Sequence, residues 1–305
     1  MLVGRLSNSM GEDGGIFNII MNSVPQILVN RSCQLSENPL WDELTGTFYW
    51  TNITGGDLWS HHLLSGETKC VYHGPNVGGF TQEADGSLIL FRIDDIVRLD
   101  ADGSLREIAK FSEPGNARFN DVTSDPHGRV FAGTVGDSPT SGGVYRFDPD
   151  GSKRRVITGT GCSNGMAFTA DRKRFYWTCS TRKQIWIYDY DEITGEITNG
   201  RLWYQASEDE GITDGLTIDL QDNIWSARWD GYRVAQHDAS DGHVLQVIKF
   251  PVAKVSSVTF GGPDFGTMFL TTAGGDGEKS HDGAIFTLQV PGVQGRAKFR
   301  SKLAG

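Results

Sequence analysis

Four oxygen-bearing side chains recur at one position of a repeated pattern: Glu37, Asn120, Asn164 and Asp214, each standing at the head of a short apolar run. Weaker copies at Gly79 and Ser256 complete the series, with successive spacings of 42, 41, 44, 50 and 42 residues. Two carboxylates and two amides that face one small volume need compensation, because like charges at close range cannot both stay ionised. A hard divalent cation with all-oxygen ligands, such as Ca²⁺, Mg²⁺ or Mn²⁺, would supply it.

The alternative interpretation is a set of turns. Asn and Asp before Gly are common turn residues, so Asn164-Gly165 or Asp214-Gly215 taken alone would indicate a turn. The same register in four of the six copies favours a site instead. Arg118 lies two residues before Asn120, and strand alternation places both side chains on one face; its alternative role is a surface salt bridge.

Histidine chemistry is not indicated. None of the seven histidines stands at the repeated position, which argues against a His-ligated zinc site and against a Ser-His-Asp triad.

The elements that must position these residues are short strands separated by turns. Asp85-Gly86, Asp102-Gly103 and Asp150-Gly151 are typical hairpin turns, and convincing helical periodicity is absent. A strand-filled repeat of 41 to 50 residues in six copies predicts an all-β fold, a six-bladed β-propeller. In a propeller the first strand of each blade lines the central channel, so equivalent positions converge on the axis.

The two ends of the chain are expected to differ. Residues 1–24 are interpreted as an irregular extension, or as an upstream start with Met21 as a second candidate, and residues 25–305 as one propeller domain. Gln26-Ile27-Leu28-Val29 has no partner of its own and is predicted to close the ring as the outer strand of blade six. Lys298 to Gly305 is expected to be a polar tail.

Composition excludes several classes of partner. A net charge of −10 argues against nucleic acid, and no apolar run approaches the ~20 residues that span a bilayer. The apolar stretch at residues 15–21 follows acidic residues, which makes a poor secretory signal. Four cysteines without a CxxC pair favour a reduced, cytoplasmic setting; Cys162 and Cys179 flank one hairpin, where free thiols are favoured over a disulfide.

The chain resembles the gluconolactonase, senescence-marker-protein (regucalcin) and luciferin-regenerating-enzyme family of six-bladed propellers. The resemblance rests on residues 37–42, 118–121, 163–166, 214–216 and 225–231, in that order, and covers residues 34 to 290. It implies one divalent metal ion, Ca²⁺ first with Zn²⁺, Mg²⁺ or Mn²⁺ as alternatives, held by Glu37, Asn164 and Asp214. It also implies substrate contacts from Arg118 and Asn120. Three residues depart from the family pattern: Asn38, Cys179 and Arg228.

The expected function is a metal-dependent lactonase that opens a sugar lactone to its acid. Asp214 is expected to accept a proton from the attacking water. The alternatives are a non-catalytic metal- or ligand-binding propeller and a hydrolase of other esters, such as organophosphates, at the same metal.

The charge of the substrate is left open between two hypotheses. Arg92 and Arg228 end the second strands of two blades, whose ends return to the face where Arg118 lies. Arg228 is therefore a candidate substrate-binding residue, and three guanidinium groups at one mouth would select an anionic lactone. Alternatively, Arg92 and Arg228 pair with neighbours such as Asp94, Asp95 or Asp230.

Overall fold

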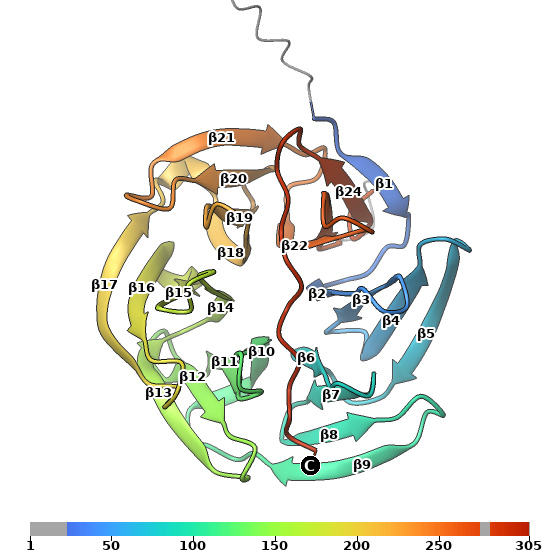
Figure 1. The fold of residues 1–305 in the computed structure, drawn as a ribbon, viewed down its shortest axis with the longest axis vertical. Coiled ribbons are helices and arrows are strands. Elements are labelled where there is room, and N and C mark those ends of the chain that lie inside the picture. Colours follow the sequence, from blue (N-terminus) through green and yellow to red (C-terminus); the bar gives the residue numbers. More distant parts are fainter. Residues whose placement is uncertain (1–22, 275–280, 305) are drawn as a thin grey trace, which may run out of the picture.

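Six antiparallel sheets of four strands each form a ring around a central channel (Figure 1). The computed structural model describes residues 23–274 and 281–304. Blade one holds β2 (Ser36–Asp42), β3 (Thr47–Asn52), β4 (Asp57–His62) and β5 (Glu67–His73), and blade two holds β6 (Gly79–Gln82), β7 (Leu88–Phe91), β8 (Asp95–Leu99) and β9 (Leu105–Lys110). Blade three holds β10 (Asn116–Ser124), β11 (Val130–Gly136), β12 (Gly142–Phe147) and β13 (Lys153–Thr160).

Blade four holds β14 (Ser163–Phe168), β15 (Arg174–Cys179), β16 (Gln184–Tyr190) and β17 (Ile197–Gln205). Blade five holds β18 (Ile212–Ile218), β19 (Ile224–Trp229), β20 (Arg233–His237) and β21 (Val244–Lys249), and blade six holds β22 (Val255–Gly261), β23 (Thr267–Thr272), β24 (Ile285–Gln289) and β1 (Gln26–Val29). Two 3₁₀ turns, η1 (Ser180–Arg182) and η2 (Glu208–Glu210), complete the described elements. The predicted six-bladed propeller is confirmed.

The ring is closed by the N-terminal strand, as the sequence predicts. β1 pairs with β24 antiparallel, with Gln26 opposite Thr287 and Ile27 opposite Phe286. Neighbouring blades are joined by apolar and aromatic side chains: between blades one and six, Phe269 stacks on Trp41 at 5.2 Å and on Phe48 at 4.8 Å between ring centroids. The expectations for residues 1–22 lie outside the described residues.

Five of the six inner strands carry an irregularity near the repeated position. The pairing register shifts between Glu37 and Leu40 in β2, and equivalent shifts occur in β10, β14, β18 and β22. Only β6, in which glycine replaces the polar residue, pairs without a shift along its described length. A bulge bends its strand and redirects side chains, so these shifts help to turn the polar residues toward the axis.

The C-terminal segment, residues 291–304, crosses the middle of the ring (Figure 1). It contacts the ends of the inner strands away from the repeated polar positions: Ser301 donates its N–H to the Gln82 carbonyl at 2.9 Å, and Lys302 donates to Gly128 at 3.0 Å. Ser301 is 1% exposed. The expected polar tail is therefore wrong for residues 298–304: although the Lys302 side chain is exposed, the segment is bonded to the blades at Lys298, Ser301 and Lys302.

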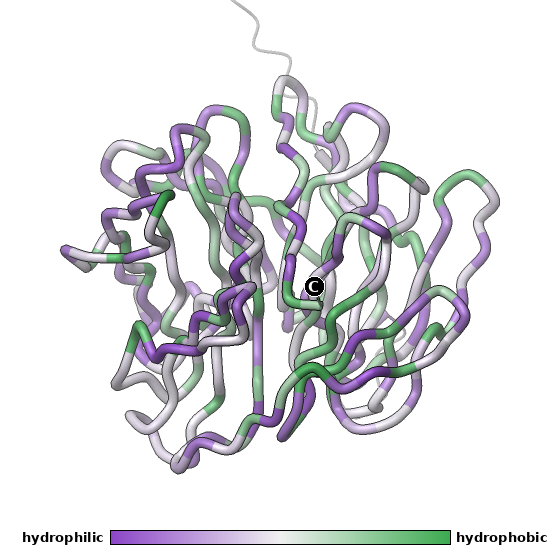
Figure 2. The backbone as a smooth tube through the Cα atoms, turned by 60° about the horizontal axis from the view of Figure 1, so that its bottom comes forward, coloured by the Kyte–Doolittle hydropathy of each residue, from purple (hydrophilic) through white to green (hydrophobic). Residues whose placement is uncertain are grey.

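Hydrophilic and hydrophobic residues alternate in short stretches along the chain, as expected for strands in mixed environments (Figure 2). Among the described residues, no helix is long and apolar enough to cross a membrane.

Candidate active site

A cavity of about 290 Å³ opens where the inner strands begin. Its walls combine the predicted polar residues with an apolar side: Leu35, Glu37, Arg118, Asn120, Cys162, Asn164, Ser180, Thr181, Ile212, Asp214 and Trp229. The structure thus brings Glu37, Asn120, Asn164 and Asp214 together with Arg118 around one space, in agreement with their shared register.

Glu37 and Asp214 are buried carboxylates with unused oxygen atoms. Their side chains are 5% and 4% exposed, and Glu37 Oε2 and Asp214 Oδ1 have no hydrogen-bond partner. Burial, followed by the charges of Asp214 and Asp121, raises the pKa of Glu37 well above its usual range. Burial and then Asp121 raise the pKa of Asp214 in the same way. Unpaired buried carboxylates are costly, and a cation between them removes that cost.

The two amides are held in a fixed chain of hydrogen bonds. Asn120 Nδ2 donates to Asn164 Oδ1 at 2.9 Å and to the Ser163 carbonyl at 2.9 Å. Asn164 Nδ2 donates to Ser180 Oγ at 2.9 Å, and that hydroxyl donates to the Thr213 carbonyl at 2.6 Å. This series of hydrogen bonds joins blades three, four and five, so the amide orientations are set before any ligand arrives.

Two glycines of the repeated motif allow the inner strands to approach closely. A Cβ atom on Gly165 would lie 2.3 Å from the Leu216 nitrogen, and one on Gly215 would lie 2.0 Å from Ser257 Oγ. Asn164-Gly165 and Asp214-Gly215 lie within β14 and β18 rather than in turns. The turn interpretation of these two dipeptides is therefore wrong.

Arg118 supplies the cation of the cavity. Its Nη1 donates to Asn120 Oδ1 at 2.6 Å and to the Phe119 carbonyl at 2.9 Å. Burial lowers the pKa of Arg118, while Cys162, Glu37 and Asp214 act to raise it. The side chain keeps further N–H groups for a carbonyl or hydroxyl acceptor.

Asp121 is a third carboxylate near the site, and its charge acts on both Glu37 and Asp214. In the sequence it is indicated only by its position next to Asn120. It is 7% exposed, and burial raises its pKa to about 6, against the lowering effects of Lys298 and Arg118. It does not line the cavity.

Sequence reasoning also missed the wall that faces the polar residues. Ser180 and Thr181 begin η1, directly after β15, and Trp229 ends β19. The return of second strands to the cavity face was the signal that could have identified them.

Cys162 also lines the cavity, and burial raises the pKa of its thiol to about 12.

The structure does not bring Arg228 to the cavity. Its side chain is 0% exposed; Nη2 lies 2.9 Å from His237 Nε2, and the guanidinium lies over the Tyr204 ring at 5.4 Å. Burial, and then the charge of Arg228, lowers the pKa of His237 to about 4. Arg92 pairs with Asp95 at 2.5 Å. The expected ring of three guanidinium groups is therefore not formed, and Arg118 alone of the three lines the cavity.

The two other departures from the family pattern have structural explanations. Asn38 adopts φ 50°, and its amide oxygen accepts the Phe80 N–H while its Nδ2 reaches the Val122 carbonyl at 3.5 Å. It therefore ties blade one to blades two and three. Cys179 is 0% exposed, lies 3.1 Å from Thr160 Oγ1 and is a free thiol, as are Cys33, Cys70 and Cys162.

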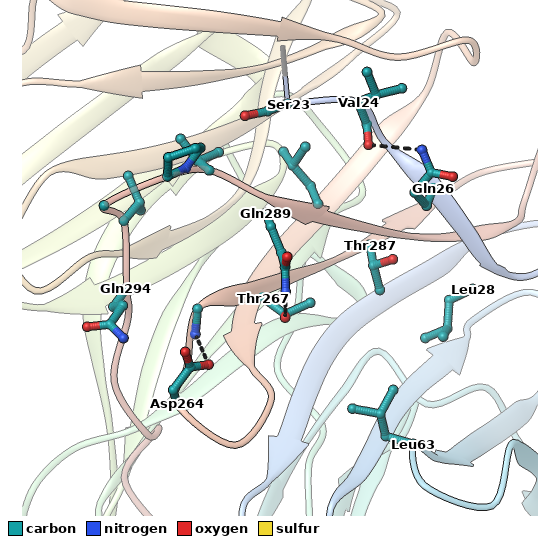
Figure 3. A pocket seen from close by; sticks show the side chains of 16 residues that line it. Ser23, Val24, Gln26, Leu28, Leu63, Asp264, Thr267, Thr287, Gln289 and Gln294 are labelled. Carbon is teal, nitrogen blue, oxygen red and sulfur yellow. Dashed lines mark hydrogen bonds between the residues drawn. The ribbon is translucent and has the colours of Figure 1, made fainter. Parts of the chain in front are cut away.

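A larger hollow of about 920 Å³ lies at the outer edge of blade six (Figure 3). Some of its polar side chains already bond to one another or to the backbone: Gln289 Nε2 donates to Thr267 Oγ1 at 3.1 Å, and Asp264 accepts the Gly266 N–H at 2.9 Å. An acidic group at a surface turn, Asp238, Asp241 and His243, is likewise internally bonded, with His243 Nδ1 2.6 Å from Asp241. Neither place gathers the repeated positions.

Comparison with known proteins agrees with the fold. The family model described as "SMP-30/Gluconolactonase/LRE-like region" matches residues 35–274. The chain is 40% identical to the pentonolactonase of Haloferax volcanii over 90% of this chain and 97% of that protein. It is 30% identical to the regucalcin of Xenopus laevis, over 89% of this chain and 96% of that protein.

Among solved structures, a luciferin-regenerating enzyme superposes with a TM-score of 0.85 at 25% identity, over 92% of this chain and 100% of that chain. The resemblance that the repeated motifs indicate is confirmed along most of the chain. This protein belongs to the SMP-30/gluconolactonase/LRE-like family.

Proposed function

We propose that this protein is a metal-dependent lactonase that hydrolyses an uncharged sugar lactone to the open-chain acid. The observation that carries the proposal is the pair of buried carboxylates, Glu37 and Asp214, whose unpartnered oxygens belong to a cavity that also contains Arg118. The names of the relatives support the reaction class: one is a pentonolactonase and another a putative sugar lactone lactonase.

The donor set fits a divalent ion. Glu37 and Asp214 offer buried oxygens without partners, and Asn164 offers an amide oxygen beside them. Hard oxygen donors of this kind suit Ca²⁺, Mg²⁺ or Mn²⁺. When bound, such an ion supplies Lewis acidity toward an ester carbonyl and lowers the pKa of a coordinated water.

The chain's own residues would then manage the protons and orient the ring. In lactone hydrolysis, a water oxygen bonds to the carbonyl carbon, the ring C–O bond breaks, and the water proton finally reaches the departing ring oxygen. Asp214, ligating the ion through one carboxylate oxygen, would accept that proton with the other oxygen and return it. Arg118 is placed to donate hydrogen bonds to the carbonyl or hydroxyl oxygens of the lactone. Asn120 already donates both amide hydrogens, to Asn164 and to Ser163, so it would meet a lactone hydroxyl as an acceptor, through Oδ1.

The cavity favours a neutral substrate over an anionic one. Arg118 is its single basic lining residue among those described, and it stands beside two carboxylates. Arg92 and Arg228 are committed to Asp95 and to the His237–Tyr204 pair. An anionic tail would therefore meet a single guanidinium instead of three, and that group already bonds to Asn120 Oδ1.

Hydrolysis of a series of neutral aldonolactones, followed by pH-stat, tests the proposal. Arg118→Ala should lower kcat/KM by about 100-fold, the usual loss for removal of one oriented donor. Arg92→Ala is the matched control, because its guanidinium is paired outside the cavity and its loss should leave kcat/KM nearly unchanged. Absence of hydrolysis across the series, or equal effects of the two substitutions, would contradict the proposal. Faster turnover of a matched anionic lactone would contradict the neutral-substrate part.

A further inference from the structure

The C-terminal segment, residues 291–304, contacts all six blades. For blades one to three, Lys298 Nζ donates to the Pro39 carbonyl at 3.0 Å, the Leu303 N–H to Glu83 Oε1 at 2.6 Å and the Lys302 N–H to the Gly128 carbonyl at 3.0 Å. For blades four to six, the Phe299 ring lies 6.4 Å from the Phe168 ring, Arg296 Nη2 donates to the Asp219 carbonyl at 2.7 Å and the Gly295 N–H donates to the Phe265 carbonyl at 2.9 Å. A segment anchored to every blade has a defined place across the end of the channel opposite the cavity (Figure 1).

This placement carries one basic side chain toward the channel interior. Lys298 borders two small spaces of about 40 and 10 Å³ beside the inner strands, together with Val122, Thr123 and Ser124 of β10. Its ammonium donates to the uncharged Pro39 carbonyl, so this contact leaves its charge uncompensated. Burial lowers the pKa of Lys298, and the charge that acts against this is Asp121.

The formal charges of the channel make Lys298 consequential. Glu37, Asp121 and Asp214 contribute three negative charges when ionised, and Arg118 and Lys298 contribute two positive ones. With a divalent ion bound and the carboxylates ionised, the net charge is +1. Without Lys298 it would be zero.

We propose that Lys298 is a built-in counter-cation of the channel. Its positive charge compensates the negative charge of Asp121 and so weakens the affinity of the site for its divalent ion. Lys298 is a positioning residue in this sense, since it does not line the cavity. The inference rests on the proposed metal site. It predicts that the C-terminal segment tunes how tightly the ion is held.

A structural role for Lys298 would have the opposite consequence. Its bond to Pro39 lies two residues from Glu37, so loss of that anchor alone would loosen the site and weaken binding. The bulge, however, has a second anchor in Asn38, which bonds to Phe80 and Val122. Removal of the charge should therefore dominate over removal of the hydrogen bond.

The test is the dissociation constant for Mn²⁺ or Ca²⁺, measured by calorimetry on chelator-stripped protein at fixed pH and ionic strength. Lys298→Met should bind about tenfold more tightly, equivalent to about 1.4 kcal/mol. Lys302→Met, which removes an exposed lysine of the same segment, should stay within about twofold of wild type. Lys298→Arg should retain the wild-type affinity.

Three further variants isolate the contribution of Asp121 and guard against misfolding. Asp121→Asn should bind the ion more weakly, and the double variant Lys298→Met, Asp121→Asn should return toward wild type, since the two charges affect ion binding in opposite directions. Lys298→Gln keeps a donor for the Pro39 carbonyl without the charge, so it should tighten binding even if Lys298→Met fails to fold.

Unchanged or weaker binding in both Lys298→Met and Lys298→Gln overturns the counter-cation. If that result accompanies a wild type that binds the ion and hydrolyses lactones, the proposed function stands and only this inference fails. A wild type that binds no divalent ion overturns both.

Discussion

The residues with most chemical consequence are the ones that the fold leaves unsatisfied. Glu37 Oε2 and Asp214 Oδ1 are buried without partners, whereas the neighbouring amides of Asn120 and Asn164 are bonded to one another. A fold of marginal stability retains buried unpaired carboxylates only where something else compensates them. A bound cation is the compensation that this donor set supports.

Asp214→Asn separates proton transfer from metal binding. Asparagine keeps one oxygen donor but cannot accept the water proton, so turnover should fall by about 100- to 10,000-fold. The dissociation constant of the metal should weaken much less, by about tenfold. Steady-state kinetics and calorimetry on the same preparation check this, and survival of near-wild-type turnover would exclude Asp214 as the base.

Proton release should accompany metal binding. The pKa values of Glu37 and Asp214 are raised, so the metal-free pair retains protons at pH values where ordinary carboxyls have lost them. The ion displaces these protons, so its affinity should rise with pH across the range of the raised pKa values. Calorimetry in two buffers with different ionisation heats counts the protons. No release at any pH from 5 to 8 would contradict the raised pKa values.

At the scale of elements, crowding among the inner strands shapes the site. Gly165 and Gly215 let β14 approach β18, and β18 approach β22, more closely than any side chain would permit. The bulges in five inner strands then bend the polar residues toward the axis. The glycines and the bulges both occur directly beside the site residues. Gly165 and Gly215 of the repeated motif therefore serve the packing of the inner strands.

Gly165→Ala measures this crowding. Its Cβ would lie 2.3 Å from backbone of β18, which should cost roughly 2–4 kcal/mol of the free energy of unfolding. Gly46→Ala is the control: it has φ +67° but open space around it, so it should cost only about 1 kcal/mol. Urea denaturation compares the two, and equal losses would show that crowding is unimportant.

The closing strand β1 provides a second test at this scale. A chain that begins at residue 23 keeps β1, whereas one that begins at residue 33 exposes the edge of β24. Unpaired edges promote association. The shorter chain should therefore unfold at a lower temperature and form aggregates, as light scattering would detect. If the two truncated chains behaved alike, β1 would contribute nothing to closure.

At the scale of the whole molecule, the repeat made the architecture predictable. Spacing alone predicted six blades, and the unpaired Gln26–Val29 strand predicted the closure, because both follow from local patterns. The convergence of Glu37, Asn120, Asn164 and Asp214 followed from the same symmetry.

Features that depend on long-range partners could not be predicted. Arg228 was expected at the mouth, but its burial depends on His237 and Tyr204, which reach it from β20 and β17. The sequence predicts a polar tail at the end of the chain, although Lys298 bonds to the Pro39 carbonyl, 259 residues away in the sequence. Composition carries no information about such partners.

The central claim is that one divalent ion in the channel enables lactone hydrolysis. The most direct measurement follows bound metal and aldonolactone turnover together while the ion is added back to chelator-stripped protein. We expect negligible enzymatic turnover at the start, and then a rate that rises in proportion to occupancy and saturates at one ion per chain. A stripped protein that hydrolyses the lactone at the full rate, or an occupied one that does not hydrolyse it, would show that the ion does not enable hydrolysis.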